Sequence, residues 1–216
     1  GGGTDYPEWW QQRPGAVVGL AINKYCYVGV KPLPPGQLHE NGEPLRFRVQ
    51  YSKVDDCRTG DVIQHPAVRA AVKYFDLQLP TEFHIFGDLP GRSGLGGSSS
   101  FVVGLLLAMR TMRGEPYSSC KALAEEAIRL ERQVIQEAVG CQDQYFAAYG
   151  GVHHLTFDSE RGCSVEPLVL SESLLSELER SLILVYSGEM RDAHEMAARQ
   201  IREQSSHVQT LEALGK

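Results

Sequence analysis

Residues 89–100 read Leu-Pro-Gly-Arg-Ser-Gly-Leu-Gly-Gly-Ser-Ser-Ser, and this glycine- and serine-rich stretch constrains the fold more than any other. It lies between a predicted strand at residues 82–86 and a strongly apolar segment at residues 101–112. Glycine allows positive φ and lets the backbone approach a ligand closely. A glycine-rich turn that leads into a helix presents free N–H groups and the positive end of the helix dipole, which together bind anions. The stretch therefore predicts a phosphate-binding loop of the kind that holds a nucleotide.

The composition is that of an ordinary soluble globular protein, with 42% hydrophobic and 22% charged residues in a chain of 216. The net charge of −6 and the lack of clustered Lys and Arg argue against a nucleic-acid-binding surface. No run of 18 apolar residues occurs, so we expect no transmembrane helix, and the first residues do not resemble a signal peptide. Five widely spaced cysteines without a CxxC pair indicate reduced thiols in a cytoplasmic compartment.

The hydrophobic pattern predicts the other elements. Residues 45–51 alternate apolar and polar side chains, which indicates a half-buried strand in a sheet with one solvated face. Residues 101–113 are apolar on nearly every side and predict a buried helix with a rigidly held N-terminus. A second long helix is predicted at 118–139, with Gly140 as its C-cap. Residues 16–22 and 25–30 predict one long strand or two short ones, and further strands are predicted at 152–157, 163–168 and 182–186. A turn is predicted at 55–60, and further helices from His65 to Phe75 and at 190–214.

This order of elements is not the regular strand–helix alternation of a doubly wound fold. The glycine loop has no Walker lysine after it and does not match the dinucleotide-binding fingerprint. The phosphate chemistry that the loop predicts must therefore belong to another class of protein.

Three oxygen-bearing side chains accompany the loop. Ser98 lies where the loop enters its helix, Glu131 lies on the second long helix, and Asp143 follows that helix. Magnesium prefers an octahedral oxygen shell and usually takes one or two protein oxygens with waters and substrate phosphates. Ser98 and Glu131 suit that role, and Asp143 would then be free to accept a proton from an attacking hydroxyl. Taken alone, a helix Glu is usually solvated and a helix-end Asp is usually a cap.

Several motifs together resemble the GHMP kinases (galactokinase, homoserine, mevalonate and phosphomevalonate kinases). The loop resembles the family's central Pro-x3-Gly-Leu-Gly-Ser-Ser-Ala motif, with Gly97 where the family commonly has the first Ser and Ser98 matching the second. Glu131-Arg132, followed by Gly140 and Asp143, resembles the family's Glu-Arg helix and catalytic Asp, at a spacing one residue longer than in mevalonate kinase. Gly3-Thr4-Asp5-Tyr6 resembles the sugar-binding segment of galactokinase.

The resemblance implies an ATP-dependent sugar kinase that uses Mg²⁺, with Asp143 as the catalytic residue. Across the chain the motifs are most similar to the heptose 7-phosphate kinase branch, which implies phosphorylation of that sugar phosphate at its anomeric hydroxyl. Ser98 and Glu131 would hold the metal, and Arg92 is either a phosphate ligand or an ordinary surface arginine. The implied ATP- and phosphate-binding residues are Gly91, Arg92, Ser93, Gly94, Leu95, Gly96, Gly97, Ser98 and Ser99, and the implied substrate-binding residues are Gly3, Thr4, Asp5 and Gln142.

The implied fold is α+β. A GHMP-kinase-like N-terminal domain, with a mixed or antiparallel sheet and helices on one side, would span residues 1–175, and the start of a ferredoxin-like C-terminal domain would span 176–216. The family's first strand and its last glycine-rich motif are not in the sequence, so we expect a chain truncated at both ends. The expected partners are a small sugar phosphate and ATP, without nucleic acid or membrane, and a homodimer is a candidate assembly.

Three alternatives stay open at this point. The chain could belong to another GHMP sugar 1-kinase, of the fucose, galactose or mannose type. It could belong to a regulator that binds ATP or a sugar phosphate without catalysis. The glycine loop could also be a purely structural turn between a strand and a helix.

Overall fold

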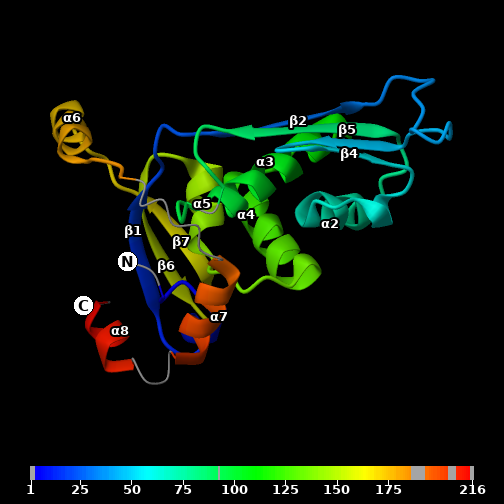
Figure 1. Cartoon of the computed structure of the whole chain (residues 1–216). Coiled ribbons are helices and arrows are strands. Elements are labelled where there is room, and N and C mark those ends of the chain that lie inside the picture. Colours follow the sequence, from blue (N-terminus) through cyan, green and yellow to red (C-terminus); the bar gives the residue numbers. More distant parts are fainter. Residues whose placement is uncertain (1–2, 92, 186–192, 204–207, 215–216) are drawn as a thin grey trace.

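The computed structural model describes residues 3–91, 93–185, 193–203 and 208–214 (Figure 1). In this described part the strands form two sheets, and both lie against one group of helices. The larger sheet is mixed, because β3 (Phe47–Gln50) runs parallel to β5 (Thr81–Gly87) while its other pairs are antiparallel. The α+β class with a mixed sheet is therefore confirmed. The four-stranded sheet has the order β2 (Cys26–Pro32), β5 (Thr81–Gly87), β3 (Phe47–Gln50), β4 (Val54–Cys57), and the three-stranded sheet has the order β1 (Gly15–Leu20), β6 (Val152–Asp158), β7 (Gly162–Pro167).

The helices α2 (Pro66–Tyr74), α3 (Gly97–Met112) and α4 (Cys120–Arg129) cover one face of the four-stranded sheet (Figure 1). Helix α5 (Gln142–Tyr149) packs against α3, α4 and β1 between the two sheets. The described helices are α1 (Pro7–Trp10), α2 (Pro66–Tyr74), α3 (Gly97–Met112), α4 (Cys120–Arg129), α5 (Gln142–Tyr149), α6 (Glu172–Ser181), α7 (Ala193–Glu203) and α8 (Val208–Leu214), with a 3₁₀ turn η1 (Gly60–Val62) and a π-helix η2 (Leu130–Ile135). None of the helices in these ranges is both long enough and apolar enough to cross a membrane.

The predicted alternation and the predicted buried helix are both confirmed. Phe47 and Val49 are buried on β3, while Arg48 and Gln50, which alternate with them, are partly exposed. On α3, Leu105, Leu106 and Met109 are completely buried. These side chains belong to one apolar core between the four-stranded sheet and its helices, and burial of such side chains supplies most of the free energy that holds the layers together. This core fixes the first turn of α3 in place.

The second long helix differs from its prediction. The α-helix ends at Arg129 and continues as a π-helix to Ile135, and Gln136 then adopts a left-handed φ of 66°. Gly140 is therefore not a helix C-cap, and that prediction is wrong. The polar residues from Gln142 onward form the first turn of α5. π-helical turns are frequent at functional sites, and this one carries Glu131.

Two further predictions are corrected by the structure, a third is confirmed in its described part, and one helix was missed. Residues 182–185 form no strand, and residue 186 lies outside the described residues. Residues 55–57, predicted as part of a turn, belong to β4. Of the predicted helix at 190–214, residues 193–203 (α7) and 208–214 (α8) are helical, and residues 190–192 and 204–207 lie outside the described residues. Helix α6 was not predicted, although Ser171 caps it by accepting a hydrogen bond from the Leu174 N–H at 3.3 Å.

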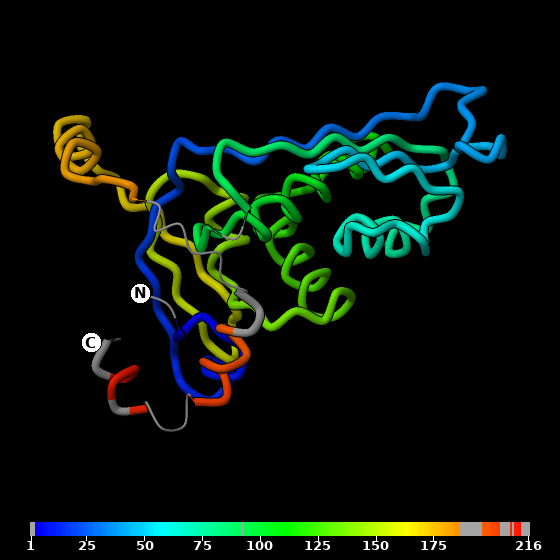
Figure 2. The backbone as a smooth tube through the Cα atoms, viewed as in Figure 1, coloured from blue at the N-terminus to red at the C-terminus, as the bar shows by residue number. Residues whose placement is uncertain are grey.

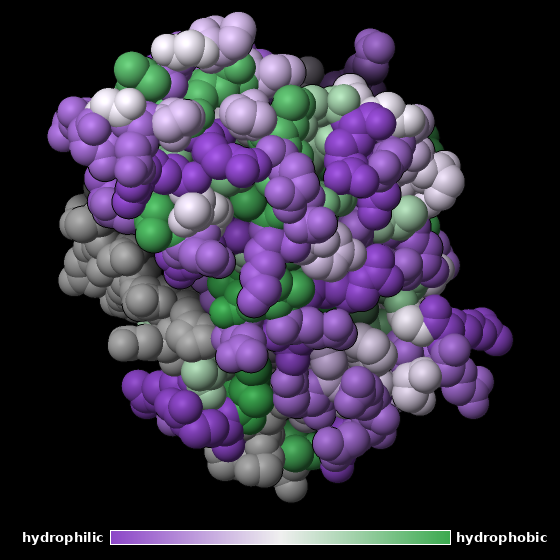
Figure 3. Space-filling model, turned by 90° about the vertical axis from the view of Figure 1, so that its right-hand side faces the viewer, coloured by the Kyte–Doolittle hydropathy of each residue, from purple (hydrophilic) through white to green (hydrophobic). Residues whose placement is uncertain are grey.

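The N-terminal segment lies beside α7 and α8, as the backbone trace shows (Figure 2). The Tyr6 hydroxyl donates to Gln200 Oε1 at 3.3 Å, and Arg13 pairs with Glu212 at 3.3 Å. The first residues of the chain are therefore held between α5 on one side and the C-terminal helices on the other. The opposite end of the molecule, near α2 and β4, presents a mostly hydrophilic face (Figure 3).

Candidate functional site

The glycine loop ends at an open helix N-terminus. Gly96 is the N-cap of α3 and has a left-handed φ of 67°, and no side chain in the described residues caps this first turn. Ser98 is exposed in that turn, and a Cβ atom added to Gly97 would meet no atom within 4 Å. The exposed first turn keeps the free N–H groups and positive dipole that an anion needs. Of the predicted loop residues, Gly91, Gly94, Leu95, Gly97 and Ser98 are exposed, Ser93 and Gly96 are half-buried, Ser99 is buried, and Arg92 lies outside the described residues.

Asp143 lies against this loop. A Cβ atom on Gly96 would be 3.1 Å from both Cγ and Oδ2 of Asp143, so a side chain at position 96 would push the Asp143 carboxylate away by a few tenths of an ångström. Burial, and then the negative charge of Asp5, raise the pKa of Asp143 to about 6. A carboxylate with raised proton affinity beside an anion-binding helix terminus can accept a proton from a hydroxyl group.

Asp5 connects the N-terminal segment to α5. Its Oδ2 accepts hydrogen bonds from the backbone N–H groups of Cys141 at 3.0 Å and Gln142 at 3.2 Å. Its Oδ1 accepts from the N–H of Gly3 at 3.0 Å, and the residue is only 2% exposed. Asp5 therefore caps α5 from a distant part of the sequence. Its assignment to the sugar stays a prediction, as do those of Gly3 and of the half-buried Gln142.

Thr4 has a clear structural role. Its hydroxyl donates to the carbonyl of Ala16 at 3.0 Å and accepts from the N–H of Ala16 at 3.2 Å. These bonds fasten the N-terminal segment to the start of β1. Its predicted contact with substrate also stays a prediction.

Gly140 is required by the Asp5 contact. A Cβ atom at position 140 would lie 1.9 Å from Oδ2 of Asp5. The sequence predicted a helix C-cap at Gly140. The actual reason for a glycine here is its contact with Asp5, which lies more than a hundred residues away along the chain and gives no local signal.

Beneath the loop, Ser99, Glu131 and Gln144 form a buried polar cluster. The Ser99 hydroxyl donates to Glu131 Oε1 at 2.9 Å, and Gln144 Nε2 donates to Glu131 Oε2 at 2.5 Å and to Ser99 Oγ at 3.1 Å. Glu131 and Gln144 are 0% exposed, and Ser99 is 4% exposed. Burial raises the pKa of Glu131 to about 7, against the opposing effect of the bonds from Gln144 and Ser99.

The contacts in this cluster bear on which residues could bind a metal. Ser99 contacts Glu131, whereas Ser98 lies on the exposed side of the loop. Gln144 was missed, and its Oε1 atom is buried without a hydrogen-bond partner in the described residues. No group of three or more His, Cys, Asp or Glu that could hold a metal occurs among those residues, but Mg²⁺ needs only one or two protein oxygens. The Glu131 carboxylate and the unpartnered Gln144 carbonyl are the hard oxygen ligands that Mg²⁺ takes, so the donor chemistry fits.

Several charged side chains surround Tyr6. Burial, Asp5 and Asp143 raise the pKa of its hydroxyl to about 12, Arg132 opposes the rise, and Glu8 adds to it. Arg132 donates from Nη2 to Glu8 Oε1 and from Nη1 to the carbonyl of Val139. These charged groups therefore share one neighbourhood with Asp143.

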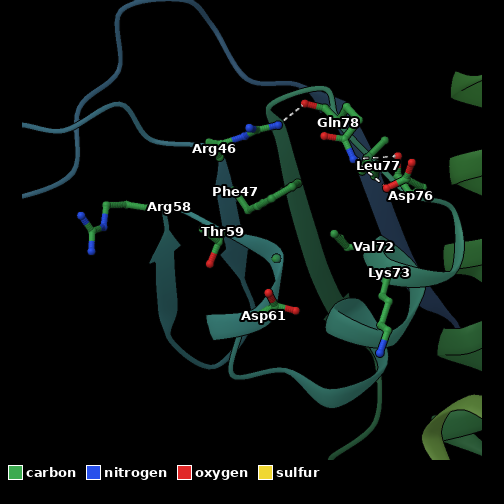
Figure 4. Close-up of a pocket in the computed structure, with 11 residues that line it drawn as sticks. Arg46, Phe47, Arg58, Thr59, Asp61, Val72, Lys73, Asp76, Leu77 and Gln78 are labelled. Carbon is green, nitrogen blue, oxygen red and sulfur yellow. Dashed lines mark hydrogen bonds between the residues drawn. The ribbon is translucent and has the colours of Figure 1, made fainter.

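A separate pocket of about 280 Å³ lies at the other end of the four-stranded sheet. In Figure 4 the side chains of Arg58 and Lys73 extend away from each other, and Arg46 is turned toward the backbone carbonyl of Gln78. Its cationic groups do not converge on one point, and none of the predicted site residues lines it. We therefore place the candidate site at the loop, α5 and the N-terminal segment.

Comparisons with known proteins identify proteins that this chain resembles. Residues 63–151 match the family described as "GHMP kinases N terminal domain", and this range contains the glycine loop, Glu131 and Asp143. The chain is 26% identical over 199 residues to D-glycero-alpha-D-manno-heptose 7-phosphate kinase of Campylobacter jejuni, covering 91% of this chain and 58% of that protein. It is 25% identical over 215 residues to the bifunctional fucokinase/GDP-fucose pyrophosphorylase of Arabidopsis thaliana, covering 91% of this chain and 20% of that protein.

Solved structures show the same fold. A D-glycero-D-manno-heptose 1-phosphate kinase from Bacteriodes thetaiotaomicron superposes with a TM-score of 0.70 at 20% identity, covering 98% of this chain and 69% of that one. The mevalonate kinase of Methanococcus jannaschii gives a TM-score of 0.52 at 10% identity, covering 90% of this chain and 66% of that one.

Gly140→Ala tests the Asp5 cap. Because the new methyl group would overlap Oδ2 of Asp5, we expect this variant to lose roughly 2–4 kcal/mol of unfolding free energy. Gly97→Ala is the matched control, since a Cβ there meets no atom within 4 Å, and it should unfold like the parent or slightly later. Urea unfolding followed by circular dichroism measures both. Equal stability of the two variants would contradict the close contact.

Gln144→Leu tests the buried cluster. The substitution removes the donor to Glu131, so we expect a loss of about 1–3 kcal/mol at pH 8, where Glu131 is ionised. The loss should be smaller at pH 5.5, where Glu131 is protonated, because its pKa is about 7. Urea unfolding of variant and parent at both pH values measures this, with Gln142→Leu as the control. The same loss at both pH values would show that Gln144 does not stabilise the ionised form.

Proposed function

We propose that this chain, which carries the N-terminal domain of the GHMP kinases, belongs to an ATP-dependent sugar kinase that phosphorylates D-glycero-D-manno-heptose 7-phosphate at its anomeric hydroxyl. The observation that carries the proposal is the approach of Asp143, with its raised pKa, to the open N-terminus of α3. The similarity to the Campylobacter jejuni enzyme supports the sugar. The chain spans 58% of the length of that relative, and so the activity of the whole protein is part of the proposal.

In this mechanism the protein positions two reactants and neutralises charge. The loop from Gly91 to Ser99, with Arg92, and the first turn of α3 bind the phosphates of ATP through backbone N–H groups and the helix dipole. Asp143 accepts, or at least orients, the proton of the attacking sugar hydroxyl, which thereby becomes a better nucleophile toward the γ-phosphate. Phosphoryl transfer depends mainly on such positioning and on electrostatic stabilisation.

Mg²⁺ has a defined place in the proposal. Ser98 and Glu131 would hold it, with the unpartnered Gln144 carbonyl as a further oxygen ligand, and a bound Mg²⁺ would supply charge neutralisation to the phosphates. Glu131 is kept in position by Ser99 and Gln144. Gly3, Thr4, Asp5 and Gln142 are the proposed sugar-binding residues.

The domain assignment is also proposed. Residues 1–175 would form the ATP- and phosphate-loop domain, and residues 176–216 would begin a C-terminal, ferredoxin-like domain. The proposed setting is a cytoplasmic enzyme that acts on small molecules, with a homodimer as a candidate assembly.

The second candidate is another sugar 1-kinase on the same scaffold, which the similarity to the Arabidopsis thaliana protein favours. Incubation of the full-length protein with γ-labelled ATP and a panel of heptose 7-phosphate, mannose, fucose and galactose separates the two. Transfer of label to heptose 7-phosphate above the other sugars supports the proposal. ATP binding without transfer to any of the four sugars would instead indicate a regulator on a kinase scaffold.

Asp143→Asn separates chemistry from stability. Without the proton acceptor we expect turnover to fall by about 10²–10⁴-fold.

The same variant should unfold at a higher temperature at pH 7.5, because the pKa of Asp143 rises from 3.8 in the unfolded chain to about 6 on folding. The ionised carboxylate therefore costs the native state roughly 1–3 kcal/mol above pH 6, and this cost disappears near pH 4. Coupled ADP-release assays and thermal melts at pH 7.5 and 4 measure these effects. Full turnover with an intact fold would contradict the assignment.

The pH profile gives an independent check on Asp143. Activity should rise with pH through about 6, since the proton acceptor must be ionised. In Asp5→Asn the negative charge near Asp143 is removed while an oxygen remains to accept from the α5 amides, so the acid limb of kcat/KM should move to lower pH. Sugar and phosphate titrations are the same in both enzymes and cancel in the comparison. An unmoved limb would show that another group controls it.

A further inference from the structure

The candidate site is strongly acidic on the side where the sugar would bind. Asp5, Glu8 and Asp143 all contribute to the raised pKa of Tyr6, so their carboxylates act on one small volume. A phosphorylated sugar brings at least one further negative charge on a group that does not react. Such a substrate needs a cation on this side of the site, separate from the groups that hold ATP.

Arg132 supplies that cation among the described residues. It donates to the carbonyl of Val139, and the next residue, Gly140, lies against the Asp5 carboxylate at the start of α5. Its positive charge is therefore next to Asp5, in agreement with its lowering of the pKa of Tyr6. It directly follows Glu131 on the π-helix. Its side chain is 20% exposed and therefore reaches the surface of the site.

Arg132 has two hydrogen-bond partners, a backbone carbonyl that stays in place and a partly exposed carboxylate that another anion could replace. Nη1 donates to the carbonyl of Val139, which holds the guanidinium against the loop that leads to α5. Nη2 donates to Glu8, whose side chain is 40% exposed on the short helix α1. Nε has no partner within the described residues. An arginine has five N–H donors, so a second acceptor can bind beside the Val139 carbonyl without breaking that bond.

We propose that Arg132 binds the non-reacting phosphate of the sugar substrate, and that Glu8 is the internal carboxylate which this phosphate displaces. The inference rests on the proposed function and names the feature that would make the enzyme select phosphorylated over unphosphorylated sugars. A guanidinium binds phosphate through two parallel N–H···O bonds, which is a stronger arrangement than one exposed ion pair. Release of Glu8 costs little, because exposed ion pairs contribute only about 0–1 kcal/mol.

The test compares heptose 7-phosphate with the same heptose without its phosphate, by calorimetric titration in the absence of ATP. We expect Arg132→Gln to weaken binding of the phosphorylated sugar by about tenfold or more while binding of the plain sugar stays within about twofold. Glu8→Gln should strengthen binding of the phosphorylated sugar, because the competing charge is removed. Arg13→Gln, which breaks the Arg13–Glu212 pair on the same N-terminal segment, is the matched control and should bind both sugars like the parent.

Two results would overturn the inference. If Arg132→Gln weakens both sugars equally, Arg132 is only a brace for the loop that leads to α5. If Glu8→Gln weakens the phosphorylated sugar, Glu8 supports the site and does not compete in it. Glu8→Gln also keeps the test decisive if Arg132→Gln fails to fold. Because binding is measured without ATP, a parent protein that binds heptose 7-phosphate but does not phosphorylate it would contradict the proposed function and leave the Arg132 inference standing.

Discussion

The hydrogen bonds from the backbone of α5 to the Asp5 carboxylate are the contact on which the rest of the site depends. They join residues 136 positions apart in the sequence. A carboxylate at a helix N-terminus satisfies unpaired N–H groups and interacts favourably with the helix dipole. The first turn of α5 carries Gln142, Asp143 and Gln144, so one cap sets the position of the proposed base and of the residue that orients Glu131.

The same arrangement concentrates negative charge where burial is high. Asp143 and Glu131 have raised pKa values because both are removed from water, and the carboxylate of Asp5 increases the effect on Asp143. Charged groups in such positions reduce the stability of the native state, and proteins tolerate them mainly where function requires them. The large apolar core under the four-stranded sheet provides the rigid support that this site needs. Arg132 is the described group that offsets part of the charge.

Local patterns predicted the parts of the fold that local forces determine. The alternation around Phe47, the apolar helix that contains Leu105 and the glycine loop before it were all predicted from the sequence, because their signals lie within a few residues. The π-helix that presents Glu131 was not predicted, since its form depends on packing against α2 and α3. The resemblance to a family indicated Asp143. No local signal marked Ser99 or Gln144 as partners of Glu131, because their contact depends on how three helices meet.

The N-termini of α3 and α5 both lie at the site, and they differ because the Asp5 side chain caps only α5. The first turn of α3 has no capping side chain in the described residues, and so its positive dipole is available to an external anion. The first turn of α5 is already neutralised by Asp5. An uncapped α5 would stabilise the ionised form of Asp143 and lower its pKa, which would make it a weaker proton acceptor. In the proposed mechanism the cap therefore leaves α3 as the helix N-terminus that is open to phosphate, and it keeps the pKa of Asp143 raised beside it.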